Sequence, residues 1–210
     1  MSFYEDRIVP HLIQMGMSQE NLALYRHRLL PAAEGHVLEI GVGSGLNIPL
    51  YGGSVTDVIG LDPSPKLLSM AEETISRVSL RVELLRATAE AIPLPDESVD
   101  TLVTTWTLCS IPNVARALSE MHRVLKANGR LLFVEHGRAP DANVRRWQDR
   151  LTPIWRRITG GCHLNRAIGP LIQDAGFRIE RMDMGYMKGP KLMTFMYEGT
   201  ARPKSVDAGR

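Results

Sequence analysis

Short apolar segments alternate along the chain with segments that have the periodicity of helices. The apolar segments are rich in β-branched residues or alternate between apolar and polar positions, which is typical of strands. There are seven of them: His36–Gly41, Asp57–Leu61, Leu80–Leu85, Val99–Thr105, Arg130–Glu135, Phe177–Met184 and Lys191–Tyr197. Strands that alternate with helices pack into a mostly parallel sheet, which the helices cover. The sequence therefore predicts an α/β fold built on one sheet.

The predicted sheet is doubly wound and Rossmann-like, with seven strands that are mostly parallel and an antiparallel last strand. The loop over 185–190 is short, and short loops join antiparallel neighbours in a hairpin. Ligands of doubly wound sheets bind beyond the carboxyl ends of the strands. We therefore expect the functional residues to lie where the strands end.

Capping residues predict where the helices begin. Three helices follow such a residue: 19–30 after Ser18, 65–76 after Ser64, and 114–126 after Asn113. Pro65 suits the first helical position, and the turn residues Asn128-Gly129 are expected to end the third helix. A fourth helix over 142–159 is expected to be interrupted or kinked near Pro153.

The expected elements divide the chain into three parts: an N-terminal helical segment (1–35), a single domain (36–199) and a flexible tail (200–210). Within the first part, residues 3–17 are expected to close over the ligand as a lid. Tyr4 and His11 are its candidate contacts.

Composition excludes several classes of protein. The 210 residues are 44% hydrophobic and 23% charged, which fits one globular domain and argues against disorder. The net charge of +2 does not favour nucleic acid as a partner. No apolar run approaches a membrane span, and acids and a proline occupy the place of a signal-peptide core. Two cysteines favour a reducing cytoplasm.

A glycine loop ends the first strand, in the stretch Glu39-Ile40-Gly41-Val42-Gly43-Ser44-Gly45. Glycine allows sharp turns and close approach of the backbone to a ligand. The spacing G-x-G-x-G departs from the dinucleotide fingerprint, and no Gly-Lys-Ser/Thr follows as in a P-loop. The carboxylate of Glu39 would repel a pyrophosphate but suit an ammonium or sulfonium. The alternative is that Glu39 only caps backbone amides.

Asp62 ends the second strand, after the glycine loop in the chain. An acid at this position can accept hydrogen bonds from both hydroxyls of a ribose. The alternative is a helix cap, but Ser64 already fills that role. Together with the glycine loop, Asp62 predicts a nucleoside site without a pyrophosphate.

Four stretches in this order resemble the class I S-adenosylmethionine-dependent methyltransferases: VLEIGVGSG, VIGLDPS, ATAEAIPLPDESVD and LKANGRLLFVEHG. The resemblance implies S-adenosyl-L-methionine as the cofactor. It places the methionine end at Glu39, Gly41, Gly43 and Gly45, the ribose at Asp62, and the adenine at Thr88 and Ala89. Pro63 and Thr105, which lie at the ends of the second and fourth strands, complete the predicted cofactor-binding set.

This sequence departs from the family at the adenine position. The family often has an acid or Asn there, whereas this chain has Thr88, and a hydroxyl is a weaker acceptor than a carboxylate. Either backbone atoms near Ala89 recognise the adenine or cofactor affinity is modest. Glu90 is expected to be an exposed residue rather than a ligand.

The stretches TLCSIPNVARALSEMHRVL, FVEHG and GGCHLNRAIGPLIQDAGF resemble the branch of the thiol S-methyltransferases and their bacterial relatives. This favours a small, lipophilic acceptor with a thiol, and phospholipid N-methyltransferases and quinone C-methyltransferases are the alternatives. His136 is the candidate catalytic base or an orienting residue. Trp106, Cys109 and His163 are candidate acceptor contacts; Trp106 and Cys109 are otherwise core residues, and His163 a loop residue.

No metal site is predicted, because a Cys-His site would need more ligands at workable spacing. The stretch Arg145–Ile158 combines arginines with Trp147, Leu151, Ile154 and Ile158 at helical spacing. It predicts a helix in peripheral contact with a membrane surface or a lid over a lipophilic acceptor. The alternative is a surface helix whose apolar stripe packs on the sheet. The sequence yields no prediction of oligomeric state.

Two further functions are alternatives to a methyltransferase of small molecules. A non-catalytic protein that keeps the cofactor fold and acts as a partner subunit is disfavoured by the intact glycine loop and Asp62. A nucleic-acid methyltransferase is disfavoured by the nearly neutral charge and the lack of an Asn/Asp-Pro-Pro-aromatic motif after the fourth strand.

Overall fold

The computed structural model describes residues 14–204, in which seven strands form one sheet in the order β3-β2-β1-β4-β5-β7-β6. The strands are β1 (Gly35–Ile40), β2 (Val55–Leu61), β3 (Val82–Leu85), β4 (Val99–Thr105), β5 (Leu125–His136), β6 (Phe177–Tyr186) and β7 (Phe195–Pro203). Only β7 pairs antiparallel, with β5 on one side and β6 on the other. The predicted α/β sheet with an antiparallel last strand is therefore confirmed.

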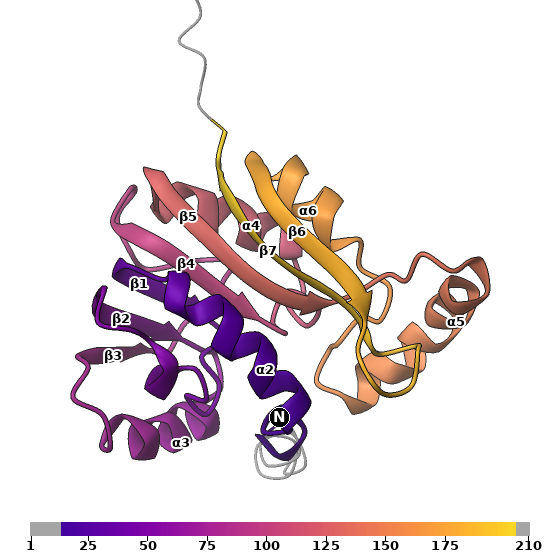
Figure 1. Ribbon diagram of the computed structural model, residues 1–210, viewed down its shortest axis with the longest axis horizontal. Helices are drawn as coiled ribbons and strands as arrows, with labels where there is room; N and C mark the ends of the chain where they lie inside the picture. Colours follow the sequence, from indigo (N-terminus) through magenta and orange to yellow (C-terminus); the bar gives the residue numbers. More distant parts are fainter. Residues whose placement is uncertain (1–13, 205–210) are drawn as a thin grey trace, which may run out of the picture.

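Helices cover both faces of the sheet and one of its ends (Figure 1). They are α2 (Glu20–Leu29), α3 (Pro65–Ile75), α4 (Val114–Val124), α5 (Ala142–Ile158) and α6 (Ile168–Asp174), with short 3-10 turns η2 (Leu30–Ala32) and η3 (Ile48–Leu50). Helix α2 crosses one face of the sheet, and α4 and α6 lie on the other. Helix α5 lies beyond the carboxyl end of β5. None of the helices described between residues 14 and 204 is long and apolar enough to cross a bilayer.

Alternation along the central strands divides the core between the two faces. Leu38 of β1 and Phe133 of β5 face the core that α4 and α6 close, whereas Val37 and Leu132 face the core closed by α2. All four are fully buried, and burial of each such side chain contributes about 1.5–3 kcal/mol. This two-sided burial holds the ends of β1, β4 and β5 rigidly together at one edge.

Two of the predicted helix caps are confirmed. The amide of Leu67 donates to the hydroxyl of Ser64 at 3.3 Å, and the amide of Arg116 donates to Oδ1 of Asn113 at 3.1 Å. The prediction for Ser18 is wrong. Helix α2 begins at Glu20 after an extended Gln19, and the Ser18 hydroxyl instead donates to the carbonyl of Met15.

Strands β5 and β7 contain more residues than predicted. Helix α4 ends at Val124, and Asn128-Gly129 lie inside β5 because Leu125 already pairs with Val99 of β4. Strand β7 begins at Phe195, later than expected, and runs to Pro203, so the first residues of the predicted tail belong to the sheet. Tyr4 and His11 of the predicted lid lie outside the described residues.

Candidate active site

The glycine loop after β1 turns through backbone conformations that favour glycine. Gly41, Gly43 and Gly45 have φ of 71°, 56° and 79°. A Cβ on Gly41 would lie 2.4 Å from Oγ1 of Thr107, so the loop after β4 approaches the backbone there closely. A Cβ on Gly43 would meet nothing closer than 3.9 Å, so the backbone at Gly43 is open to a ligand.

Glu39 lies beneath this loop with its carboxylate buried. Its two oxygens accept hydrogen bonds from Nδ2 of Asn47 at 2.8 Å and from the hydroxyl of Tyr51 at 2.7 Å. Nδ2 of Asn47 also donates to Oγ1 of Thr105 at 3.1 Å, which joins β1 to β4. These donors are side chains, whereas the alternative hypothesis for Glu39 requires backbone amides.

Burial dominates the electrostatics of Glu39. It raises the pKa of this carboxyl to about 7, although hydrogen bonds from Tyr51 and Asn47 and the charge of Arg26 act in the opposite direction. A cationic ligand near the loop would therefore stabilise the charged form of Glu39. Arg26, on α2, is itself buried, which lowers its pKa.

Asp62 joins the glycine loop to the start of α3. Its Oδ2 accepts a hydrogen bond from the amide of Gly43 at 3.1 Å, and its Oδ1 accepts one from the amide of Ser64 at 2.8 Å. Burial raises its pKa against the effect of these two amides. A carboxylate has about four lone-pair sites, so Asp62 can still accept bonds from a ligand. Pro63, beside it, is exposed and has no polar contact among those described.

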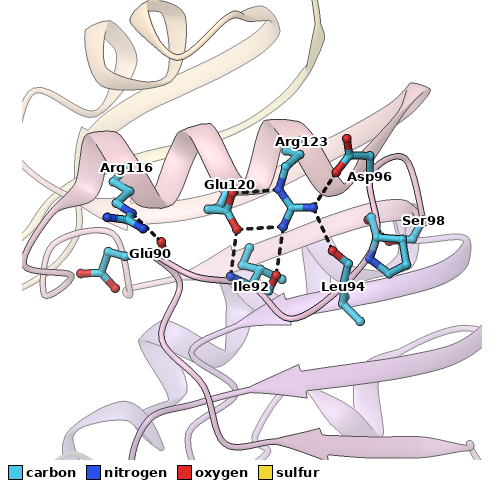
Figure 2. A network of polar contacts seen from close by, with 9 residues as sticks. Glu90, Ile92, Leu94, Asp96, Ser98, Arg116, Glu120 and Arg123 are labelled. Carbon is cyan, nitrogen blue, oxygen red and sulfur yellow. Dashed lines mark hydrogen bonds and ion pairs between the residues drawn. The ribbon is translucent and has the colours of Figure 1, made fainter.

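The loop after β3 is fastened to α4. Thr88 is exposed and Ala89 is buried. Glu90 is half-buried and serves as a structural acceptor: its side chain accepts from the amide of Asn113 at 3.2 Å, and its carbonyl accepts from Nε of Arg116 at 2.8 Å. These bonds place the predicted adenine loop next to α4 (Figure 2).

Arg123 of α4 is the centre of the network in Figure 2. Its guanidinium donates to the carboxylates of Glu120 and Asp96 at 2.7–2.8 Å and to the carbonyls of Ile92 and Leu94 at 2.9 Å. Glu120 also accepts from the amide of Ile92 at 3.0 Å. One arginine thus fixes the backbone that follows Ala89.

Glu135, near the end of β5, holds the turn that follows β4. Its Oε1 accepts hydrogen bonds from Oγ1 of Thr104 at 2.8 Å and from the amides of Thr107 and Leu108 at 3.0 and 3.1 Å. Burial raises the pKa of Glu135 to about 8, with a further increase from Cys109. This contact places the acceptor side of the site next to Gly41, which Thr107 contacts.

His136, Cys109 and Cys162 come together beyond Glu135. Nε2 of His136 lies 3.1 Å from Sγ of Cys162, and the three ligand atoms all lie within 4.8 Å of one another. Hydrogen bonding with Cys162 lowers the pKa of Cys109, and the same bond and burial raise that of Cys162. Burial lowers the pKa of His136. Cys109 and Glu135 act in the opposite direction and outweigh burial, so the net shift is upward.

The other predicted acceptor contacts occupy different places. Nδ1 of His163 lies 3.0 Å from the carbonyl of Cys109, so this side chain fastens its loop to the turn after β4. Trp106 has a φ of 53°, and its ring packs against α2: edge-on to Tyr25 and 4.8 Å beneath the guanidinium of Arg26. Its ring therefore belongs to the α2 side of the site.

Several residues of this site were not among the predicted ones, including Arg26, Asn47, Tyr51, Glu135 and Cys162. Asn47 and Tyr51 follow the glycine loop closely, so their position was the available signal. Arg26 reaches the site only through the packing of α2, and no local motif marks it. Cys162 reaches it through the loop after α5; it lies in the stretch GGCHLNRAIGPLIQDAGF, which carries the resemblance but gives this cysteine no role.

Known proteins that are similar to this chain are described as methyltransferases. A family model described as a methyltransferase domain matches residues 38–133. The chain is 34% identical over 170 residues to a phosphatidylethanolamine N-methyltransferase of Cereibacter sphaeroides, covering 79% of this chain and 80% of that protein. It is 35% identical over 147 residues to a thiol S-methyltransferase of Rattus norvegicus, covering 67% of this chain and 59% of that protein.

Among solved structures, a SAM-dependent methyltransferase of Thermotoga maritima superposes with a TM-score of 0.68. The two chains are 22% identical, and the match covers 95% of this chain and 97% of that one. At this identity the likeness shows a shared fold.

Proposed function

The chain belongs to the class I S-adenosylmethionine-dependent methyltransferases, and from that premise we propose that it methylates a small, lipophilic acceptor, with a thiol sulfur favoured. The observation that carries the proposal is the junction between the glycine loop and the turn after β4. Thr107 contacts Gly41, and Cys109 two residues later lies with His136 and Cys162. A cofactor site and a site rich in sulfur and imidazole therefore adjoin.

The residues of the glycine loop fit the cofactor. The backbone is open to a ligand at Gly43. Burial disfavours the charged form of Glu39, which a cationic ligand would stabilise. Asp62 keeps lone pairs beside the loop that can accept hydrogen bonds. We infer that Glu39, Gly41, Gly43, Gly45 and Thr105 hold its methionine end, Asp62 and Pro63 its ribose, and Thr88 and Ala89 its adenine. When bound, S-adenosylmethionine supplies a methyl group on a sulfonium, which is an excellent leaving group.

The protein's own task is to orient the acceptor and exclude water. Orientation alone can lower such a barrier by about 7–11 kcal/mol. A thiol needs little help from a base, because a few per cent of it is already thiolate at neutral pH. His136 is the group we propose to face the acceptor and take its proton. The position of Arg26 and Trp106 supports a role of the N-terminal helical segment as a cover over this site.

Two other acceptors remain alternatives, each with a different demand on the site. A phospholipid amine must lose a proton before it can attack, and a quinone carbon needs an enol and a base. Both would require His136 in its neutral form. A thiol makes the smaller demand on the site, because part of it is already thiolate at neutral pH.

The test uses methyl-labelled S-adenosylmethionine with three acceptors: a long-chain alkyl thiol, phosphatidylethanolamine vesicles and a demethylated quinone. We expect mass spectrometry to find the label in the thiol. Asp62→Ala should abolish transfer, while Asp57→Asn, which changes the other acid of β2, should not. Label in the amine or the quinone would replace the proposed acceptor. Cofactor binding without transfer to any acceptor would favour the non-catalytic partner protein.

We further propose that α5 contacts an anionic membrane surface from which a lipophilic acceptor is drawn. Trp147, Ile154 and Ile158 are 53%, 62% and 53% exposed, so the alternative in which this stripe packs on the sheet is wrong for these three. Arginines flank them: Arg145, Arg146, Arg150, Arg156 and Arg157. Exposed Trp and Ile beside arginines are typical of interfacial helices, and the charge complements anionic headgroups.

Vesicle sedimentation tests this surface. We expect binding to vesicles that contain phosphatidylserine, weaker binding to purely zwitterionic vesicles, and loss of binding for the double change Trp147→Glu and Ile154→Glu. Leu24→Glu is the matched control, because Leu24 is 60% exposed on α2. Equal binding of the double variant, or equal loss with Leu24→Glu, would show that α5 is not the contact.

A further inference from the structure

Three donor atoms of the kind that bind soft metal ions converge from three separate segments. Cys109 follows β4, His136 ends β5, and Cys162 lies in the loop between α5 and α6. Their Sγ and Nε2 atoms lie within 4.8 Å of one another. These residues are far apart in the sequence, so no spacing motif announces the cluster.

The geometry suits one four-coordinate ion. Zn–S and Zn–N bonds are about 2.3 and 2.0–2.1 Å long, so two ligands of a tetrahedral zinc ion lie roughly 3.4–3.8 Å apart. Small side-chain rotations bring atoms within 4.8 Å to such distances. Two thiolates with one imidazole favour soft cations such as Zn²⁺, and three protein ligands leave the fourth position open.

The backbone around the cluster is held in place by contacts that do not involve the three donors' ligand atoms. The carbonyl of Cys109 accepts from the amide of His163 at 2.8 Å, and Arg166 donates to the carbonyls of Leu108 and Ile111. At Gly161 a Cβ would lie 3.1 Å from the carbonyl of Ser110, so the two segments approach closely. The loop after α5 is therefore built to hold Cys162 against Cys109.

A second observation points to a missing partner. His136 Nδ1 is a buried polar atom with no hydrogen-bond partner in the described part of the chain. A buried nitrogen without a hydrogen-bond partner costs free energy. Water that arrives with an ion bound at the cluster would supply such a partner. In zinc sites the second nitrogen of a histidine ligand usually has an acceptor, which an ordered water can supply.

We propose that Cys109, His136 and Cys162 bind one Zn²⁺ ion whose fourth position faces the acceptor side. A consequence, which rests on the proposed function, concerns the acceptor thiol. The acceptor would release its proton to solvent and bind the ion as thiolate. Its sulfur would then take the methyl group as the carbon–sulfonium bond breaks with its electron pair going to the leaving sulfur. With the ion bound, His136 is a ligand and takes no proton, so in this state the ion takes over the role of base that is proposed above for His136 without the ion.

Cobalt titration of the reduced, chelator-treated full chain tests the site directly. The chain has two cysteines, so any thiolate-to-Co²⁺ charge-transfer band must come from Cys109 or Cys162. We expect one ion per chain with intense tetrahedral bands that Zn²⁺ displaces. Loss of an outer-shell partner alone costs about 10–100-fold, so Cys162→Ser and Cys109→Ser should each weaken binding by a factor on the order of 100 or more. Ser76→Ala, at the end of α3, is the control and should retain binding.

Cofactor binding at the glycine loop, measured on the same samples, shows that each variant is folded. Failure to observe a thiolate band in folded, reduced protein would overturn the zinc site, as would binding that survives Cys162→Ser. Formation of a Cys109–Cys162 disulfide by a mild oxidant in protein that binds no ion would assign the pair a redox role instead.

The consequence for the acceptor is tested separately. If the ion binds but a chelator leaves thiol methylation unchanged, the metal site stands and its part in the reaction is refuted. If the ion binds and no thiol is methylated, the proposed acceptor fails while the site stands.

Discussion

The carboxyl group of Glu39 is enclosed at the end of β1, and its pKa is raised to about 7 by burial. A cation bound nearby stabilises the carboxylate, so binding below this pKa must release a proton. Affinity for S-adenosylmethionine should therefore rise as the pH increases through about 7 and then level off. Calorimetry in buffers of different ionisation enthalpy measures both the affinity and the released proton.

Glu39→Gln keeps the shape of the side chain and removes the charge. We expect it to weaken cofactor binding at about pH 8 by roughly tenfold or more and to flatten the pH dependence. Tyr51→Phe is the control, because it removes one hydrogen bond to Glu39 and leaves the carboxylate. A pH dependence that persists in Glu39→Gln would assign it to another group.

Two glycines of the same loop should respond differently to alanine. Both have positive φ, which costs an alanine about 1–2 kcal/mol. Gly41→Ala adds a collision with the side chain of Thr107, whereas Gly43→Ala meets open space. Thermal unfolding should show the larger loss of stability for Gly41→Ala, and Gly43→Ala should lose cofactor binding while it remains folded. Unchanged affinity in Gly43→Ala would place the cofactor elsewhere.

At the scale of elements, α4 positions the loop after β3 through Arg123. Arg123→Ala removes hydrogen bonds to two carboxylates and two carbonyls and should lower the free energy of unfolding by about 1–3 kcal/mol. Hydrogen exchange should accelerate over residues 87–94, and cofactor affinity should fall because the adenine loop loosens.

Arg123→Lys keeps the charge but cannot reach all these acceptors at once, so it should recover only part of the loss. Arg116→Ala is the comparison variant on the same helix. It removes one bond to this segment, to the carbonyl of Glu90, so exchange over 87–94 should accelerate less than in Arg123→Ala. Exchange over 87–94 that is the same in Arg123→Ala as in the unaltered chain would contradict the positioning role.

The elements that the sequence predicts well are those whose ends are marked locally. Ser64 and Asn113 cap their helices because a side-chain oxygen meets an amide three residues on. Gly129 shows the opposite case. A Cβ there would lie 2.9 Å from the carbonyl of Asp100, so the glycine permits close approach between strands rather than ending a helix. Tertiary pairing of Leu125 with Val99 decided the boundary.

Residues of the candidate site also differ in whether the local sequence marks them. The positions of the glycine loop and Asp62 at the ends of β1 and β2 could be predicted, because they depend on neighbours in the chain. Asn47, Tyr51 and Arg26 contribute through a 3-10 turn and a packed helix, and Cys162 through a loop 53 residues after Cys109. Only the folded chain shows that these residues share one edge of the sheet.

At the scale of the whole molecule, two enclosed acids should make stability depend on pH. Glu39 and Glu135 have pKa values raised to about 7 and about 8 by burial, above the 4.5 of an exposed glutamate. The folded chain thus holds these protons more tightly than the unfolded chain. Their contribution to stability is present below about pH 4.5 and is lost as the pH rises to about 8.

Calorimetry of the ligand-free protein should show this loss as a falling Tm between about pH 5 and about pH 8. For one such acid, a loss on the order of 3 kcal/mol corresponds to roughly 6–12 °C for a chain of this size. The double change Glu39→Gln and Glu135→Gln should flatten the curve. S-adenosylmethionine should also reduce the fall, because a cation near Glu39 stabilises its charged form. A Tm that rises over this range without ligand would mean that other groups dominate the pH dependence.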